Sequence, residues 1–179
     1  ISELPWNAYN SYVKWKSNND SSCFIFNSDT GVICGMKGYN QDTTLHDDGT
    51  GCSSPTTHTD GTVVIPKEIR NNDGVTKEVV AIGDGAFMEL TARNQITSLA
   101  FAADSEVTSL GSFAFYNCTK LTNISLPSSL KRMEDRAIGV TKISSITIPY
   151  SVDYIGLNAL NSNTLLTELT IGDETKGTA

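Results

Sequence analysis

Apolar and polar residues alternate in the same order twice between residues 121 and 165. The first copy begins Leu121-Thr-Asn-Ile124-Ser-Leu126-Pro127, and the second begins Ile143-Ser-Ser-Ile146-Thr-Ile148-Pro149, 22 residues further on. In an extended chain, residues two positions apart lie on the same side, so each copy places its last two apolar residues on one face. Proline has no N–H for a strand ladder, and each copy therefore predicts a short strand that ends at its proline.

A second apolar segment follows the proline and leads into a turn. In three copies it ends in glycine, as Ile82-Gly83, Leu110-Gly111 and Ile155-Gly156, which predicts a second short strand and a tight bend. An alanine and a large apolar residue come next in every copy: Ala86-Phe87, Ala114-Phe115, Ala137-Ile138 and Ala159-Leu160. We expect a short helical turn here, with alanine where the turns stack and the larger side chain in the core.

The repeat extends in both directions from this pair. An earlier copy begins at Thr62, the next begins at Ile96 with Ala102 in the proline position, and a fifth begins at Leu166 and stops after its strand. The anchor alanines are 28, 23 and 22 residues apart, and extra residues at 91–95 lengthen the first interval. A unit of this size cannot bury its own apolar face, but stacked units bury a continuous core. The pattern therefore predicts a solenoid of parallel strands.

The length of the repeat falls in the range of leucine-rich repeats, and the spacing L-x-x-L-x-L is typical of them. With proline after the strand, and Ala-Phe and Cys in the turn, the pattern resembles the BspA-like, or Treponema-pallidum-type, leucine-rich repeats. Residues 115–121 and 148–152 carry this resemblance best. The predicted fold class is a mostly-β, α/β-type solenoid: a right-handed coil with stacked parallel strands, short helical turns and an N-terminal β-hairpin cap. Residues 62–179 are expected to form about four repeats and a terminal strand.

Residues 1–61 are expected to form the cap and to include a long polar loop. Residues 23–26 and 32–34 are rich in β-forming side chains and flank turn-forming residues, which predicts a β-hairpin. Residues 35–61 are polar and irregular, as in a surface loop. The first 22 residues contain both tryptophans, Trp6 and Trp15. Their aromatic side chains are interpreted either as plugs for the open end of the solenoid or as a platform for carbohydrate.

Composition and charge narrow the class of partner and the location. Of the 179 residues, 39% are hydrophobic and only 18% are charged, which suits a turn-rich extracellular β-protein. A net charge of −7 disfavours nucleic acid and an electrostatic membrane anchor. No run of 18 apolar residues is present, so we expect no membrane insertion in this segment. We expect an extracellular or cell-surface monomer whose signal peptide has been removed.

The cysteines leave the disulfide pairing open. Cys23, Cys34 and Cys52 allow one bond among themselves in three ways. Cys23 would face Cys34 only if Phe26 paired with Gly31, because one step of register moves the two to opposite faces. Alternatively, Cys52 ties the long loop to the hairpin. Cys118 lies in a repeat and is expected to be a buried thiol that packs as a small hydrophobe.

Signals for metal binding and catalysis are weak. His46, Cys52 and His58 lack the ligand spacings of zinc sites, and Asp47-Asp-Gly-Thr-Gly51 lacks the alternating carboxylates of a calcium loop. Both histidines lie in one loop, and no nucleophile motif or phosphate loop is present. We expect no metal, no cofactor and no enzymatic activity.

The remaining candidate is a surface. Residues between the buried strand positions form a small polar stripe across neighbouring repeats, and its candidate binding residues are Ser98, Asn123, Ser125, Ser145, Thr147, Glu168 and Thr170. Such a stripe suits an extended partner, and it equally suits a solvated sheet face. Three tyrosines, Tyr116, Tyr150 and Tyr154, are the aromatic residues that we expect to anchor a ligand, because tyrosine is favoured at binding hot spots.

Three functions are compatible with these features. BspA-like proteins are associated with adhesion, so the resemblance implies an exported bacterial interaction module that binds a protein or glycoprotein on a host or neighbouring cell. The incomplete fifth unit also suits a spacer segment of a larger surface protein that binds nothing itself. A carbohydrate-binding accessory protein is the third alternative.

Overall fold

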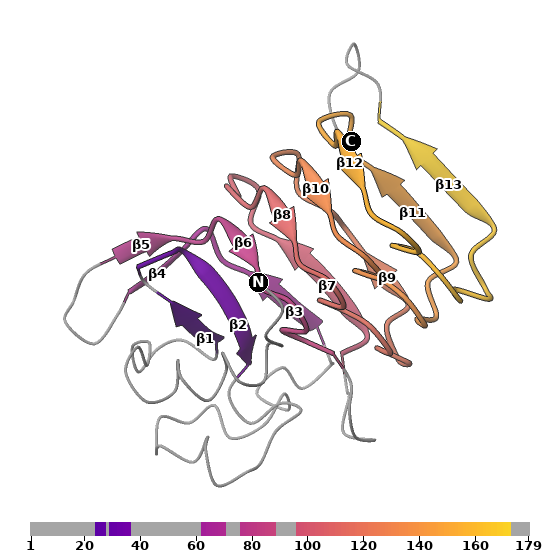
Figure 1. The fold of residues 1–179 in the computed structure, drawn as a ribbon, viewed down its shortest axis with the longest axis horizontal. Coiled ribbons are helices and arrows are strands. Elements are labelled where there is room, and N and C mark those ends of the chain that lie inside the picture. The colour runs from indigo at the N-terminus through magenta and orange to yellow at the C-terminus, as the bar shows by residue number, and fades with distance from the viewer. Residues whose placement is uncertain (1–23, 28, 37–61, 71–75, 89–95, 173–179) are drawn as a thin grey trace, which may run out of the picture.

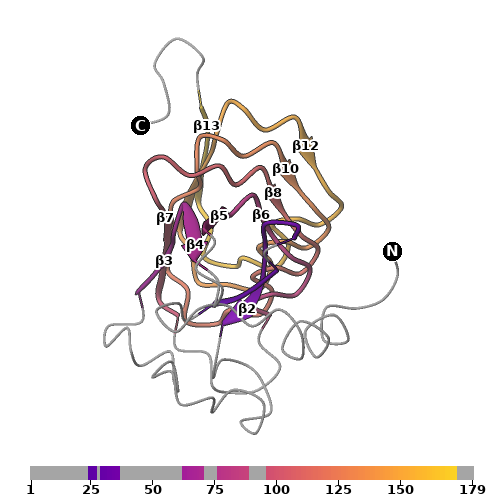
Figure 2. The same cartoon turned by 90° about the vertical axis from the view of Figure 1, so that its left-hand side faces the viewer.

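The computed structural model describes residues 24–27, 29–36, 62–70, 76–88 and 96–172, which form thirteen strands and no helix. The strands stack in two rows that face each other across an apolar core, so the described chain winds as a solenoid (Figures 1 and 2). This arrangement confirms the predicted class, a mostly-β repeat solenoid with parallel sheets.

One row is a continuous six-stranded sheet. Its order is β1 (Phe24–Asn27), β2 (Val32–Met36), β6 (Ala81–Ile82), β8 (Ser109–Leu110), β10 (Arg132–Met133) and β12 (Tyr154–Ile155). Strand β1 is antiparallel to β2, and every later pair is parallel. The later strands are the predicted second strands of the repeat units.

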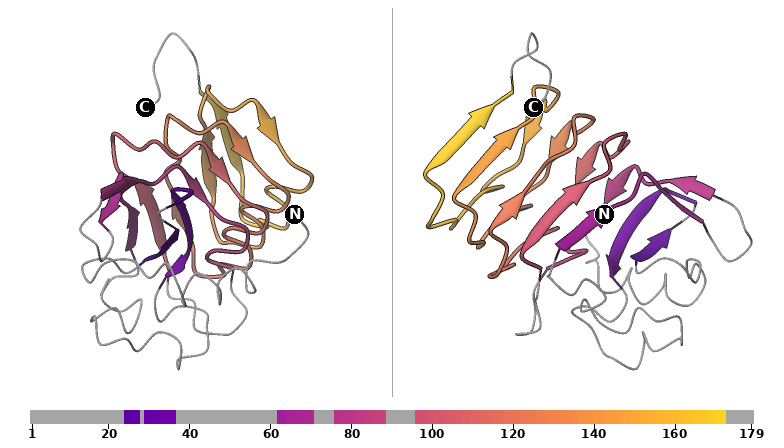
Figure 3. Two further views of the ribbon diagram at one scale, coloured as in Figure 1. Left: turned by 60° about the vertical axis from the view of Figure 1, so that its left-hand side comes forward. Right: turned by 180° about the vertical axis from the view of Figure 1, so that it is seen from behind.

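The opposite row holds the predicted first strands. Strands β3 (Thr62–Ile65), β7 (Ser98–Phe101) and β9 (Asn123–Ile124) form one parallel sheet, and β11 (Ser145–Ile148) and β13 (Glu168–Ile171) form another. The row is visible from behind in Figure 3. Strands β9 and β11 belong to different sheets, but the Lys142 N–H donates to the Leu121 carbonyl at 2.8 Å just before them. The first unit also carries a small hairpin, β4 (Glu68–Arg70) with β5 (Thr76–Glu78).

Strand register follows the sequence repeat. Leu99 aligns with Ile124, Ile146 with Leu169, and Met133 with Ile155. Each pair occupies the same position in successive units, so side chains of one kind form columns along the solenoid. The proline prediction holds at β3 and β11, which end immediately before Pro66 and Pro149.

The core is formed by these columns of apolar side chains. The inward strand residues of β3 and β11 are buried, as are Leu99 of β7 and the anchor alanines Ala86, Ala114, Ala137 and Ala159. The Phe87 and Phe115 rings stack with centroids 5.1 Å apart, and Phe24 of the hairpin meets Phe87 edge-on at 6.4 Å. Alanine therefore permits close stacking of the turns, and phenylalanine fills the core, as the sequence predicted.

The turns differ from the expected helical form. Within each turn, hydrogen bonds join a residue to the third residue before it, such as Ala114 N–H to Gly111 O at 3.2 Å. The N–H groups between these donate to the following unit, as Phe115 N–H does to Ala137 O at 2.8 Å. The backbone reaches these carbonyls through left-handed residues in two columns. One column contains Gly85, Phe113, Arg136 and Asn158, and the other contains Asn117, Val140 and Ser162, with φ between 53° and 62°. Hydrogen bonding between units therefore replaces hydrogen bonding within a helix.

The predicted hairpin is present and joins the array directly. Val32 and Ile33 of β2 align with Ala81 and Ile82 of β6, so cap and repeats share one sheet. Phe26 pairs with Ile33 next to a bulge, so the register that would let Cys23 face Cys34 is not adopted. Cys23 and Cys52 lie outside the described residues, as do Trp6, Trp15 and the loop with His46, Asp47 and His58.

Candidate interaction surface

The polar stripe predicted from the sequence lies on the outer side of the first-strand row. Register places Ser98 beside Asn123, Ser145 beside Glu168, and Thr147 beside Thr170. All seven stripe residues are exposed except Ser98, which is half-buried. We call this set the polar strand face: Ser98, Asn123, Ser125, Ser145, Thr147, Glu168 and Thr170. Its only ionisable side chain is Glu168.

Beside this face, a second column of hydroxyl side chains donates hydrogen bonds to backbone carbonyls. The Thr122 hydroxyl donates to the Thr97 carbonyl at 3.2 Å, and the Thr167 hydroxyl donates to the Ser144 carbonyl at 3.4 Å. These side chains satisfy carbonyls of the preceding unit at the start of each strand. The polar strand face lies one position further along, where side chains point outward from the sheet.

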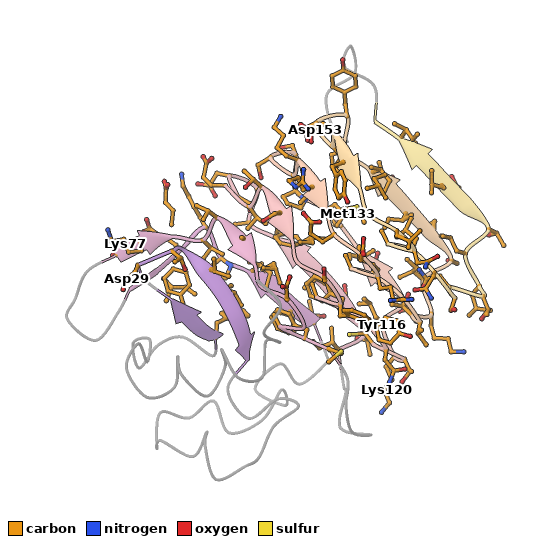
Figure 4. The ribbon with its side chains drawn as sticks, viewed as in Figure 1. Asp29, Lys77, Tyr116, Lys120, Met133 and Asp153 are labelled. Atoms are coloured by element: carbon orange, nitrogen blue, oxygen red, sulfur yellow. The ribbon has the colours of Figure 1, made fainter. Side chains whose placement is uncertain are left out.

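The three tyrosines do not lie on the polar strand face. Tyr154 belongs to β12 in the opposite row and is 39% exposed, and Tyr150 follows β11 at the corner and is 55% exposed. Tyr116 lies in a turn and is half-buried (Figure 4). Its ring meets Phe113 edge-on at 5.2 Å and lies so close to Gly139 that an added Cβ there would be 2.9 Å from it. Tyr116 is therefore part of the packing between units, and the predicted ten-residue surface divides between separate faces.

Two cation–π contacts give the opposite row and its neighbouring turns a different chemistry. The Arg132 guanidinium carbon lies 4.0 Å from the centre of the Tyr154 ring, and its Nε donates to Glu134 at 2.9 Å. The Arg136 guanidinium carbon lies 5.5 Å from the centre of the Phe113 ring. Sequence reasoning missed both contacts. The available signal was spacing, because each arginine and its ring are one repeat apart and therefore occupy the same column.

A column of small polar side chains crosses the turns beneath this surface. The buried Cys118 thiol donates to the Phe87 carbonyl at 3.3 Å, and Asn163 Nδ2 donates to the equivalent Ile138 carbonyl at 2.8 Å. Between them, the Thr141 hydroxyl donates to Asn163 Oδ1 at 2.8 Å. Cys118 is buried as predicted, and it also acts as a hydrogen-bond donor. Cys118 and Thr141 are buried and Asn163 is half-buried, and the column stabilises the stacking of units.

The described residues contain no group of three histidine, cysteine, aspartate or glutamate side chains that could hold a metal ion. Within the same ranges, no helix is long and apolar enough to cross a membrane. The described residues present the polar strand face and a second set of contacts, which we call the arginine–aromatic face: Arg132 with Tyr154, and Arg136 with Phe113.

These features define a class of protein, a leucine-rich-repeat solenoid. Residues 80–177 match the family described as "BspA type Leucine rich repeat region (6 copies)", and the chain belongs to that family. Among curated proteins, no match was found.

Three solved structures resemble the chain. A leucine-rich repeat protein from Bacteroides capillosus is 21% identical, with a TM-score of 0.60 over 88% of this chain and 100% of that one. One from Bacteroides ovatus is 26% identical, with a TM-score of 0.45 over 61% of this chain and 33% of that one. A leucine-rich cell surface protein from Faecalibacterium prausnitzii is 18% identical, with a TM-score of 0.38 over 84% and 53% of the two chains. The likeness to the Bacteroides capillosus structure supports the solenoid fold.

Proposed function

We propose that the chain is a cell-surface interaction module that uses the polar strand face to bind an extended protein or glycoprotein. The observation that carries this proposal is the regular placement of small hydroxyl and amide side chains on the outer side of aligned strands. Strands within one sheet are about 4.8 Å apart, so each of the two sheets that carry the face offers hydrogen-bonding groups at a fixed spacing to a partner that lies across it.

Family membership and composition support the same function. BspA-like repeats are associated with adhesion, and a low content of charged residues suits a surface that binds through hydrogen bonds and shape. A spacer segment would need no such face, and it would bind no partner. The two functions therefore differ in whether a partner can be found for the isolated chain.

The experiment is binding of the purified 179-residue chain to immobilised fibronectin, fibrinogen and mucin at two salt concentrations. We expect saturable binding to one of them, with little change between the two salts, because Glu168 is the only charge on the polar strand face. Strong weakening by salt would instead indicate a site built from the arginines of the opposite row. Absence of binding to all three would favour the spacer function.

Matched substitutions locate the surface. Ser125→Tyr and Thr147→Tyr place bulky side chains at exposed positions of the polar strand face, and we expect each to weaken binding about tenfold or more. The control is Thr108→Tyr, at an exposed position beside β8 in the opposite row. Equal loss in the control and the two test variants would contradict the proposed location. Tyr154→Ala separately tests whether the arginine–aromatic face contributes.

A further inference from the structure

The backbone hydrogen bonds of the first-strand row are interrupted between β9 and β11. In the pair before the interruption, the Asn123 and Ser125 N–H groups donate to carbonyls of the preceding unit at 3.3 and 2.9 Å. In the pair after it, the Glu168 N–H donates to the Ser144 carbonyl at 3.2 Å. Among the described residues, no backbone hydrogen bond joins β9 to β11, although the opposite row is continuous over the same units.

Four backbone groups at this interruption lack the partners that their counterparts have in other units. On the β11 side they are the N–H groups of Ser145 and Thr147, and on the β9 side they are the carbonyls of Thr122 and Ile124. The described part of the chain gives none of them another hydrogen bond. We call these four groups the seam. It presents donors on one side and acceptors on the other.

A one-residue difference in the sequence accounts for the seam. The connection from turn to strand is 118–121 in one unit and 163–166 in another, but between them it is 141–143, one residue shorter. Each longer connection closes with a hydrogen bond of 3.0 Å between the backbone groups of its last and first residues. In the shorter one, the Ile143 N–H donates to the Thr141 hydroxyl at 3.3 Å instead. The chain therefore enters β11 differently from β9 and β13, and the ladder between β9 and β11 does not form.

The seam lies within the polar strand face, in the row seen from behind in Figure 3. The side chains that flank it are exposed and uncharged: Asn123 and Ser125 on one side, Ser145 and Thr147 on the other. Backbone N–H and C=O groups that leave a ladder need other hydrogen-bond partners, from solvent or from a ligand. The seam therefore adds backbone donors and acceptors to the hydroxyl and amide side chains of this face.

The seam is too narrow to admit another strand. The Lys142 N–H donates to the Leu121 carbonyl at 2.8 Å before it, and the Ser151 hydroxyl donates to the Ser128 carbonyl at 2.7 Å after it. These bonds keep the two units about one strand spacing apart at both ends of the seam. An inserted peptide strand would require about 9.6 Å between β9 and β11, which is two strand spacings. A ligand must therefore approach from the outer face and reach the seam with small polar groups.

We propose that the seam binds the hydroxyl groups of a neutral glycan, so that the polar strand face recognises its partner through carbohydrate. A hydroxyl group both donates and accepts, so one sugar hydroxyl can accept from an N–H of β11 and donate to a carbonyl of β9. A carboxylate only accepts and an ammonium group only donates, so neither can join the two sides. This inference rests on the proposed function and names the chemistry of the partner.

Amide hydrogen exchange of the free chain, resolved by NMR, tests whether the seam is open. We expect the Ser145 and Thr147 amides to exchange roughly 100-fold faster than the Ser125 amide, which donates to a carbonyl of the preceding unit. Equal protection at the three positions would mean that the ladder between β9 and β11 is closed in solution, and it would overturn the proposal.

Titration with neutral oligosaccharides released from mucin tests the ligand. We expect saturable shifts of the Ser145 and Thr147 amide signals, and no shift at Thr108 beside the opposite row. Shifts confined to the opposite row, or none at all, would overturn the proposal. Binding of the chain to intact mucin that survives enzymatic removal of its glycans would support the proposed function but reject the seam as a glycan site.

A one-residue insertion tests the origin of the site. A threonine inserted between Thr141 and Lys142 gives Thr-Thr-Lys-Ile, which matches Cys-Thr-Lys-Leu at residues 118–121. We expect this insertion to close the ladder, to slow exchange of the Thr147 amide about tenfold or more, and to abolish the shifts caused by the oligosaccharides. A closed ladder with undiminished binding of the oligosaccharides would overturn the proposal.

A pair of point variants at one position keeps the test independent of the insertion. Strand β11 bonds β13 through alternate residues, such as Ile148, whose carbonyl accepts from Gly172 at 2.7 Å, so the Thr147 N–H takes no part in that pairing. Thr147→Pro removes this N–H and should raise the Kd for the oligosaccharides about tenfold. Thr147→Val keeps the N–H and loses only the hydroxyl, and it should change the Kd by about threefold or less. Equal effects of the two substitutions would show that the backbone of the seam does not bind the glycan.

Discussion

At the N-terminal end of the six-stranded sheet, an antiparallel hairpin closes the array, and Phe24 packs against the stacked pair Phe87 and Phe115. In the last described unit at the other end, Ile155, Leu169 and Ile171 are exposed. The same columns of apolar side chains reach both ends, yet the two ends differ in how far these side chains are buried. Burial in a solenoid is therefore set by the presence of a neighbouring unit as much as by residue type, as expected when each unit contacts only its neighbours.

The largest difference between the ends should appear in the aromatic column. Phe87→Ala removes a fully buried ring that contacts both the hairpin and the next unit, and we expect a loss of about 3–5 kcal/mol in the free energy of unfolding. Leu160→Ala, three units later in the same column and half-buried, should cost about 1–2 kcal/mol. Urea denaturation followed by circular dichroism measures both. Equal losses would show that the two ends are equally well packed.

A closer comparison uses neighbours in one column. Met133 is buried between Leu110 and Ile155, and Met133→Ala should cost about 2–5 kcal/mol. Ile155 is paired on one side only, and Ile155→Ala should cost about 1 kcal/mol or less in the monomer. Urea denaturation of the two variants measures both losses. A large loss at Ile155 under these conditions would mean that another part of the chain covers this end.

Gly111 and Gly156 extend the comparison, because the atoms nearest to an added Cβ at each belong to the preceding unit. A Cβ on Gly111 would lie 2.5 Å from the Asp84 backbone nitrogen, and a Cβ on Gly156 would lie 2.7 Å from that of Asp135. Gly111→Ala and Gly156→Ala should therefore cost similar amounts, about 1–3 kcal/mol each, although Gly156 lies next to the open end. Thermal denaturation of the two variants checks this. A tolerant Gly156 would imply that the terminal unit is loosely attached on both sides.

The fold was predictable because the signal is periodic. Spacing placed the repeat strands and the buried alanines, and it aligned residues that the structure confirms as columns, whereas the hairpin was predicted from β-forming segments that flank turn residues. The contacts and the exposure of the side chains in these columns were harder to predict. The Arg132–Tyr154 and Arg136–Phe113 contacts were missed, although each pair is one repeat apart in the sequence. The polar stripe and the tyrosines were joined into one surface, although Tyr154 lies in the opposite row, Tyr150 at a corner and Tyr116 in a turn. Exposure at the terminal unit was also invisible, since Ile155 reads like its buried counterparts.

The turn conformation was the other feature that the sequence did not reveal, and it gives the smallest effect. Val140 adopts φ of 57°, which a β-branched residue rarely does, because its N–H reaches the Asn161 carbonyl at 2.9 Å. The left-handed conformation costs a non-glycine residue about 1–2 kcal/mol, and part of this is offset by the greater freedom of glycine in the unfolded chain. Val140→Gly should therefore raise the unfolding free energy by about 0.5–1 kcal/mol. Ser162→Gly, at the same position one unit later, should raise the unfolding free energy by less, because serine is not β-branched. A lower unfolding free energy in both variants would show that the stabilisation from these side chains exceeds the cost of the left-handed backbone.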